Sequence, residues 1–217
     1  MVKMHKNITD KKFEVAEIYY ILNCKPTYKK FVSYLNCKYG AVGNSYFHEE
    51  SYKNHFRKNG PGNKQIKRYY KSCKKCKECK NRKNCKACEN CEGCKDCAWC
   101  KKGLYVHHVA EDKFQNLSNV SAIEKIDFGN SQDYGFEYQK SNQLVYCNLI
   151  EHTLLHLFIM KSDNTKEAGY KSLIGKIKKW FIEKEISSSE TEFYKASKIN
   201  EKEAKNLIAR FDEFKKA

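Results

Sequence analysis

The sequence predicts an α+β protein in which a small unit of two strands and one helix is embedded among further helices. Two apolar runs lead to this fold class, because residues 104–109 have the length and composition of a strand and residues 143–161 those of a strand followed by a helix. A third observation is a cysteine-rich stretch between the N-terminal helical patterns and the first run. We expect metal rather than hydrophobic burial to stabilise that stretch.

The two apolar runs carry four of the seven histidines of the chain. His107 and His108 end the first run, and His152 and His156 lie four residues apart in the helical part of the second. This spacing stacks both imidazoles on one helical face. Imidazole is a common ligand of zinc, nickel, copper and iron, so a stacked pair with a third histidine from a strand end predicts a three-ligand metal site. The fourth histidine is then available as a base.

A plainer interpretation treats the helix as a core helix whose two imidazoles are satisfied by hydrogen bonds. The helix carries two histidines rather than one, and a second histidine pair lies upstream of it. These two observations favour the metal site over the core helix. A metalloprotease does not fit, because the segment from His152 to His156 lacks the internal glutamate that acts as general base in that signature.

At these residues the sequence resembles the HNH, or ββα-metal, nucleases, most closely in the all-histidine form. The matching parts are the pair His107 and His108, the strand at 144–146, and the helix with His152 and His156. The resemblance implies that His107, His152 and His156 hold a divalent ion, namely Mg, Mn, Ni or Zn. It also implies that His108 deprotonates a water molecule.

The match covers about residues 104–161 and departs from the family pattern in two ways. The family's asparagine usually lies nine residues before the first helix histidine, where this chain has Gln143, with Asn142 beside it. We take Asn142 as the expected residue that braces the finger, with Gln143 as the alternative. Residues 109–142 also form an insertion longer than the family's loop.

Composition points to an acidic partner. The chain of 217 residues has 42 Lys and Arg against 26 Asp and Glu, a formal charge of +16. DNA is the first candidate, and a solvated basic surface without a dedicated ligand is the alternative. No apolar run approaches the ~18 residues of a membrane-spanning helix. The start of the chain has no apolar signal core, so we expect a cytoplasmic protein without membrane contact.

The cysteine-rich stretch predicts a structural zinc site. Nine of the twelve cysteines lie between Cys73 and Cys100, most of them three residues apart, with few apolar residues among them. Such a stretch cannot fold by hydrophobic burial. Two residues between thiolates suit a tetrahedral zinc site, and the expected ligands are Cys73, Cys76, Cys85 and Cys88. An iron-sulfur cluster and a short-period repeat of reduced thiols without metal are the alternatives.

The remaining patterns divide the chain into four regions. Residues 1–70 are basic, aromatic and helical, 71–103 form the cysteine-rich segment, 104–162 the metal-finger unit, and 163–217 the C-terminal helices. Apolar residues with helical spacing predict helices near 10–22, 27–39, 171–185 and 200–216. Within 45–70, lysines and arginines alternate with aromatic residues, as in a nucleic-acid contact or an ordinary amphipathic helix. We expect Cys24, Cys37 and Cys147 to be packing residues.

Together these observations predict a metal-dependent HNH-type endonuclease that hydrolyses DNA phosphodiester bonds, with Lys and Arg of residues 53–83 holding the flanking backbone. A clean double-strand break would require a symmetric homodimer. The main alternative is a non-catalytic, zinc-dependent nucleic-acid-binding regulatory protein. A third is a structural helical protein.

Overall fold

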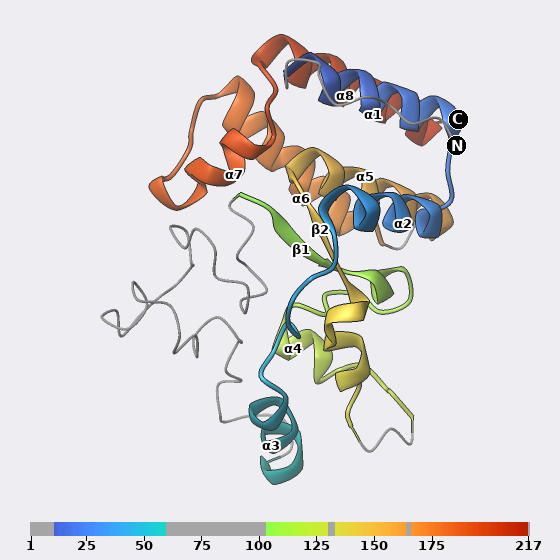
Figure 1. Ribbon diagram of the computed structural model, residues 1–217, viewed down its shortest axis with the longest axis vertical. Coiled ribbons are helices and arrows are strands. Elements are labelled where there is room, and N and C mark those ends of the chain that lie inside the picture. Colours follow the sequence, from blue (N-terminus) through green and yellow to red (C-terminus); the bar gives the residue numbers. More distant parts are fainter. Residues whose placement is uncertain (1–10, 60–102, 130–132, 164–165, 217) are drawn as a thin grey trace. The chain divides into compact units, whose positions relative to one another are not determined.

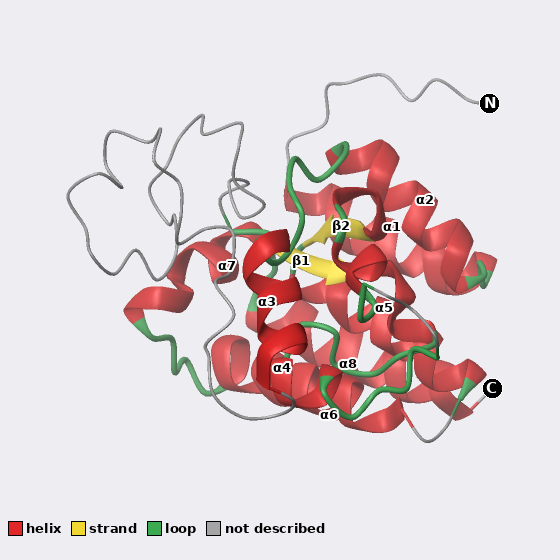
Figure 2. Ribbon diagram, turned by 90° about the horizontal axis from the view of Figure 1, so that it is seen from below, coloured by secondary structure: helices red, strands yellow, loops and turns green. Residues whose placement is uncertain are grey.

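A computed structural model describes residues 11–59, 103–129, 133–163 and 166–216. These residues are mostly helical, with one two-stranded antiparallel sheet (Figures 1 and 2). The labelled elements are α1 (Lys11–Cys24), α2 (Tyr28–Tyr39), α3 (Glu49–Asn59), β1 (Tyr105–His108), α4 (Val120–Ile123), β2 (Leu144–Cys147), α5 (Leu149–Ser162), α6 (Glu167–Ile177), α7 (Thr191–Ala196) and α8 (Glu201–Lys216). Among them, no helix is both long enough and apolar enough to span a bilayer.

The chain forms two compact units. Unit 1 takes residues 1–31 and 149–217, and unit 2 takes residues 32–148. The cysteine-rich stretch and most of the predicted basic segment, including Cys73, Cys76, Cys85 and Cys88, lie outside the described residues.

Unit 1 is a group of helices around α5. The helix α5 is apolar on nearly every side, and ten of its fourteen residues are buried. A helix of this kind is stable only when neighbours surround it. Within the unit it packs on α6, α7 and α8, and α1 runs beside α8 (Figure 1). Phe158 of α5 makes edge-to-face contacts with Phe31 at 5.4 Å and Phe214 at 5.8 Å between ring centroids.

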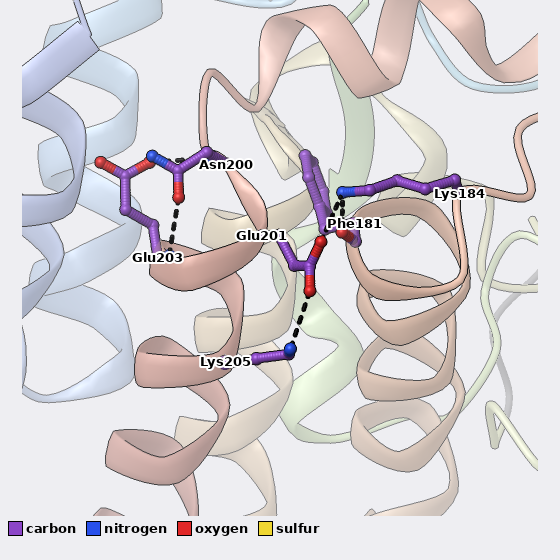
Figure 3. Close-up of polar contacts among 6 residues, drawn as sticks. All are labelled: Phe181, Lys184, Asn200, Glu201, Glu203 and Lys205. Atoms are coloured by element: carbon purple, nitrogen blue, oxygen red, sulfur yellow. Dashed lines mark hydrogen bonds and ion pairs between the residues drawn. The ribbon is translucent and has the colours of Figure 1, made fainter.

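Polar caps mark the ends of the C-terminal helices. The side-chain oxygen of Asn200 accepts a hydrogen bond from the backbone N–H of Glu203 at 3.0 Å, and the Glu203 carboxylate accepts one from the backbone N–H of Asn200 at 2.7 Å (Figure 3). This reciprocal pair satisfies donors that the first turn of α8 leaves open. Ser187 and Glu190 form the same arrangement before α7. Ser187 therefore marks a further helix start between the helices predicted near 171–185 and 200–216.

Unit 2 has its own core of aromatic and aliphatic side chains. Tyr52 of α3 is fully buried, and its hydroxyl donates to the backbone carbonyl of Tyr134 at 2.8 Å. Its ring lies 5.3 Å from that of Phe136. The buried members of this core are Val42, Tyr46, Phe47, Tyr52, Val106, Ala110, Leu117, Ile123, Phe136, Leu144 and Tyr146.

The sheet of unit 2 contains the two predicted strands. β1 pairs antiparallel with β2 (Figure 2). The register places Val106 opposite Tyr146 and His108 opposite Leu144. All four residues of β2 are buried. Asn148 alone separates β2 from α5, so the strand leads directly into the histidine-bearing helix. The expected order of strand, strand and helix is confirmed.

Of two expectations about local structure, the helix near 171–185 is confirmed over most of its length, and the packing of Cys24 and Cys37 was wrong. The predicted helix over residues 171–185 is α6 followed by a π-helical turn, Lys178–Ile182, which buries Trp180 and Phe181. Cys24 and Cys37 are exposed, so only Cys147 packs in a core as expected.

Candidate metal centre

The first pair of histidines lies on β1. His107 and His108 are each 1% exposed, and successive side chains of a strand point to opposite faces. The two imidazoles therefore leave β1 on opposite faces. The next turn, Val109–Asp112, brings Glu111 back toward both rings: its carboxylate oxygens lie 3.7 Å from Nδ1 of His107 and 3.9 Å from Nδ1 of His108.

The second pair lies on α5, where the helical spacing stacks the rings as predicted. The ring centroids of His152 and His156 are 5.0 Å apart. Both side chains are half-buried on a helix that is otherwise almost wholly enclosed. The two imidazoles therefore share one face of α5.

His107, His152 and His156 form one group. Among the described residues, these three could together hold a metal ion. An all-imidazole donor set suits zinc, nickel, copper or iron better than magnesium, which prefers oxygen ligands. These are the three residues that the sequence proposed as ligands.

The protonation of the α5 pair suits metal binding. Burial lowers the pKa of His156 to about 4. Burial also lowers the pKa of His152 well below its usual value, and the positive charges of His156 and Lys176 lower it further. Only a neutral imidazole has a nitrogen lone pair to give to a metal. Both rings are therefore in the ligand form at neutral pH.

The position of the His156 side chain depends on a glycine of α6. A Cβ atom built on Gly169 would lie 2.7 Å from Cε1 of His156 and closer still to its Nδ1. Real Cβ atoms do not approach other atoms this closely. The imidazole therefore occupies space that any other residue at position 169 would fill.

His108 is fixed by a buried hydrogen-bond chain. Nε2 of His108 lies 2.9 Å from Oε1 of Gln139, and Nε2 of Gln139 donates to the backbone carbonyl of Leu117 at 3.1 Å. Gln139 is fully buried, and the ring of Tyr46 lies 4.5 Å from that of His108. This histidine, the expected base, is thus held on one side by an amide and faces Glu111 on the other.

Glu111 and Gln139 were missed by the sequence reasoning. Burial raises the pKa of Glu111 to about 8, against a smaller opposite effect of the Leu117 backbone N–H. A carboxyl four residues after His107 was a signal that could have been noticed. Gln139 gave no such signal, because it lies in the insertion that the family pattern does not cover.

The structure also describes three other residues to which the sequence analysis gave a role. Asn142 is exposed, in the short 3-10 turn Ser141–Gln143 that precedes β2, and Gln143 is half-buried. Lys53, the first of the predicted backbone-binding residues, forms ion pairs with Glu49 at 2.8 Å and Asp133 at 2.9 Å.

Comparison with protein-family models, curated proteins and solved structures found no match to this chain.

Proposed function

We propose that this protein is a metal-dependent, HNH-type endonuclease that hydrolyses DNA phosphodiester bonds. The observation that carries the proposal is the group of His107, His152 and His156, with His108 adjoining it on β1. The formal charge of +16 supports a polyanionic substrate.

In this proposal the three histidines hold a divalent ion, which when bound would supply Lewis-acid stabilisation of the charge on the phosphate and on the leaving oxygen. His108 accepts a proton from the attacking water. The basic nitrogen available for this step is Nδ1, since Nε2 faces the side-chain oxygen of Gln139. The carboxyl group of Glu111 lies near Nδ1 of both β1 histidines. In its charged form it adds a negative charge beside the two rings, and in its protonated form it holds a proton there.

A second candidate is a zinc-dependent nucleic-acid-binding regulatory protein without catalysis. The observation that favours it is the burial of His108, which is 1% exposed and so has little direct access to bulk water. For His108 to act as a general base, the attacking water molecule would have to enter the buried site. In the regulatory alternative, metal at the histidines and at the cysteine-rich stretch would serve folding alone.

The experiment that separates these functions is plasmid nicking. Purified full-length protein is incubated with supercoiled DNA and Mg, Mn, Ni or Zn, with and without chelator. Nicking that needs metal and that His156→Ala abolishes supports the endonuclease. His48→Ala, which removes a histidine of unit 2 outside the metal-binding group, is the control and should still nick. A mobility shift without nicking supports the regulatory protein, and neither result supports a structural role.

A double-strand break needs two cuts, one in each strand. One histidine group provides one cut, so linear product would require two protomers facing the duplex, most simply as a symmetric dimer. Sedimentation of the protein with and without DNA tests this point. A monomer that only nicks would retain the proposed chemistry and exclude the dimer.

A further inference from the structure

Gln139 is a buried polar side chain, and the oxygen and the nitrogen of its amide each have a hydrogen-bond partner. It lies in the turn Phe136–Gln139 and is fully enclosed. Its Nε2 donates to the backbone carbonyl of Leu117, and its Oε1 faces Nε2 of His108. Burial of a glutamine costs free energy unless both halves of its amide are bonded, so a glutamine here has a specific role in this core.

The contact with Leu117 fixes which way the amide points. A backbone carbonyl only accepts hydrogen bonds, so the nitrogen of the Gln139 amide must face Leu117. The oxygen must then face His108, and because an oxygen of this kind only accepts, Nε2 of His108 must carry the proton. In the neutral imidazole the lone pair is therefore on Nδ1.

A second link from Gln139 reaches the same histidine by another route. The backbone carbonyl of Gln139 accepts a hydrogen bond from the backbone N–H of Tyr46 at 2.8 Å. The ring of Tyr46 packs on the imidazole of His108. Gln139 thus contacts His108 directly through its side-chain amide. Through its backbone carbonyl it also holds Tyr46, whose ring packs on the imidazole.

We propose that Gln139 is a positioning residue that holds His108 in the Nε2–H tautomer, with Nδ1 left as its basic nitrogen. It would thereby brace the histidine pair in place of Asn142, which is exposed, or Gln143, which is half-buried. This inference rests on the proposed function for its effect on rate, but its effect on the tautomer of His108 does not depend on catalysis.

The test uses full-length, reduced protein with its histidine nitrogens labelled. Nitrogen NMR of the ring distinguishes the two tautomers of His108 directly. In the wild type we expect the Nε2–H form alone. Gln139→Met, of similar shape but without a hydrogen-bond acceptor, should give a mixture of tautomers, whereas Gln139→Glu keeps an acceptor oxygen at the same reach and should restore the Nε2–H form. Gln115→Met makes the same substitution at an exposed position of unit 2 and should leave the tautomer unchanged.

Nicking kinetics supply the second readout. For Gln139→Met we expect kcat to fall roughly ten- to a hundredfold, the range typical when a residue that orients a site is lost, with little change in KM, and partial recovery in Gln139→Glu. If Gln139→Met fails to fold, the comparison of Gln139→Glu with wild type remains, and loss of the Nε2–H form there would overturn the inference.

Two further outcomes separate this inference from the proposed function. An Nδ1–H tautomer in wild-type protein, or a Gln139→Met protein with unchanged tautomer and unchanged kcat, defeats the role of Gln139 even if DNA is nicked. A wild type that never nicks DNA while Gln139→Met shifts the tautomer defeats the endonuclease and leaves the orientation of His108 standing.

Discussion

The imidazole of His156 occupies the space that a side chain at Gly169 would need. Gly169→Ala should therefore push the ring out of position, and we expect metal affinity at the histidine group to fall roughly ten- to a hundredfold, as for other changes around metal ligands. The measurement is a cobalt titration followed by the paramagnetic shifts of the imidazole protons, which distinguishes this site from thiolate sites.

Gly175→Ala is the matched control on the same helix. A Cβ at Gly175 meets nothing within 4 Å. Alanine should then act only through helix propensity, which favours it by about 1 kcal/mol, and should raise the melting temperature while leaving cobalt binding unchanged. Equal metal affinity in both variants would mean that the His156 ring has room to move without loss of its function.

The proposed roles of His108 and His156 predict two different failures. His156→Ala removes one of three ligands and should weaken metal binding and cleavage together. His108→Ala should keep metal and DNA affinity but lose the general-base contribution, roughly a hundredfold or more in rate. Cobalt titration, DNA binding and nicking are measured on both. If the two variants cleaved DNA like the wild type, the nuclease site would lie elsewhere.

The cap of α8 predicts a stability change remote from the histidines. Asn200→Ala removes the oxygen that accepts from Glu203 (Figure 3) and should lower the free energy of unfolding by about 1 kcal/mol. Asn206→Ala, on the exposed face of the same helix, should be neutral or slightly stabilising. Urea unfolding measures both, and equal stability of the two variants would contradict a role for the cap.

Removal of metal from the cysteine-rich stretch should unfold at least residues 71–103. Metal binding would supply the folding free energy there, because few apolar residues are present to form a core. Hydrogen exchange of chelated and zinc-loaded protein, both under reducing conditions, measures this. Identical exchange in the two samples would favour a repeat of reduced thiols.

DNA binding should weaken steeply with salt. Phosphate contacts from Lys and Arg release counterions, so the logarithm of the affinity should fall linearly with the logarithm of the salt concentration. Fluorescence anisotropy with a short labelled duplex across a salt series gives the slope. A flat affinity would remove charge as the basis for proposing a nucleic-acid partner.

The sequence was sufficient where structure follows from local spacing. β1, β2 and α5 were predicted because short apolar runs set strands and a four-residue interval sets the histidine stack. The helices α1, α2 and α8 followed from apolar periodicity, with Thr27 and Asn200 at their expected starts. The choice of His107 rather than His108 as the third ligand came only from a resemblance.

The remainder depends on contacts between residues far apart in the chain. Gln139 meets His108 across 31 positions, and no local pattern marks a glutamine whose amide will be buried. The π-helical turn after α6 is also set by packing, since Trp180 and Phe181 are both buried there. Gly169 is a further case, because only its contact with His156 accounts for a glycine inside α6.

Unit 2 is built from one continuous stretch of the chain, whereas unit 1 is built from two separate stretches. This difference affects the order in which the two units can fold during synthesis. Unit 2 uses residues 32–148, so all its partners have been made once residue 148 has left the ribosome. Unit 1 joins α1 to α8, where Arg210 donates to the side-chain oxygen of Asn23 at 2.7 Å. The part of α5 that packs on α8 therefore stays uncovered until α8 emerges, and we expect nascent chains stalled before α8 to be more exposed to aggregation and to chaperone capture.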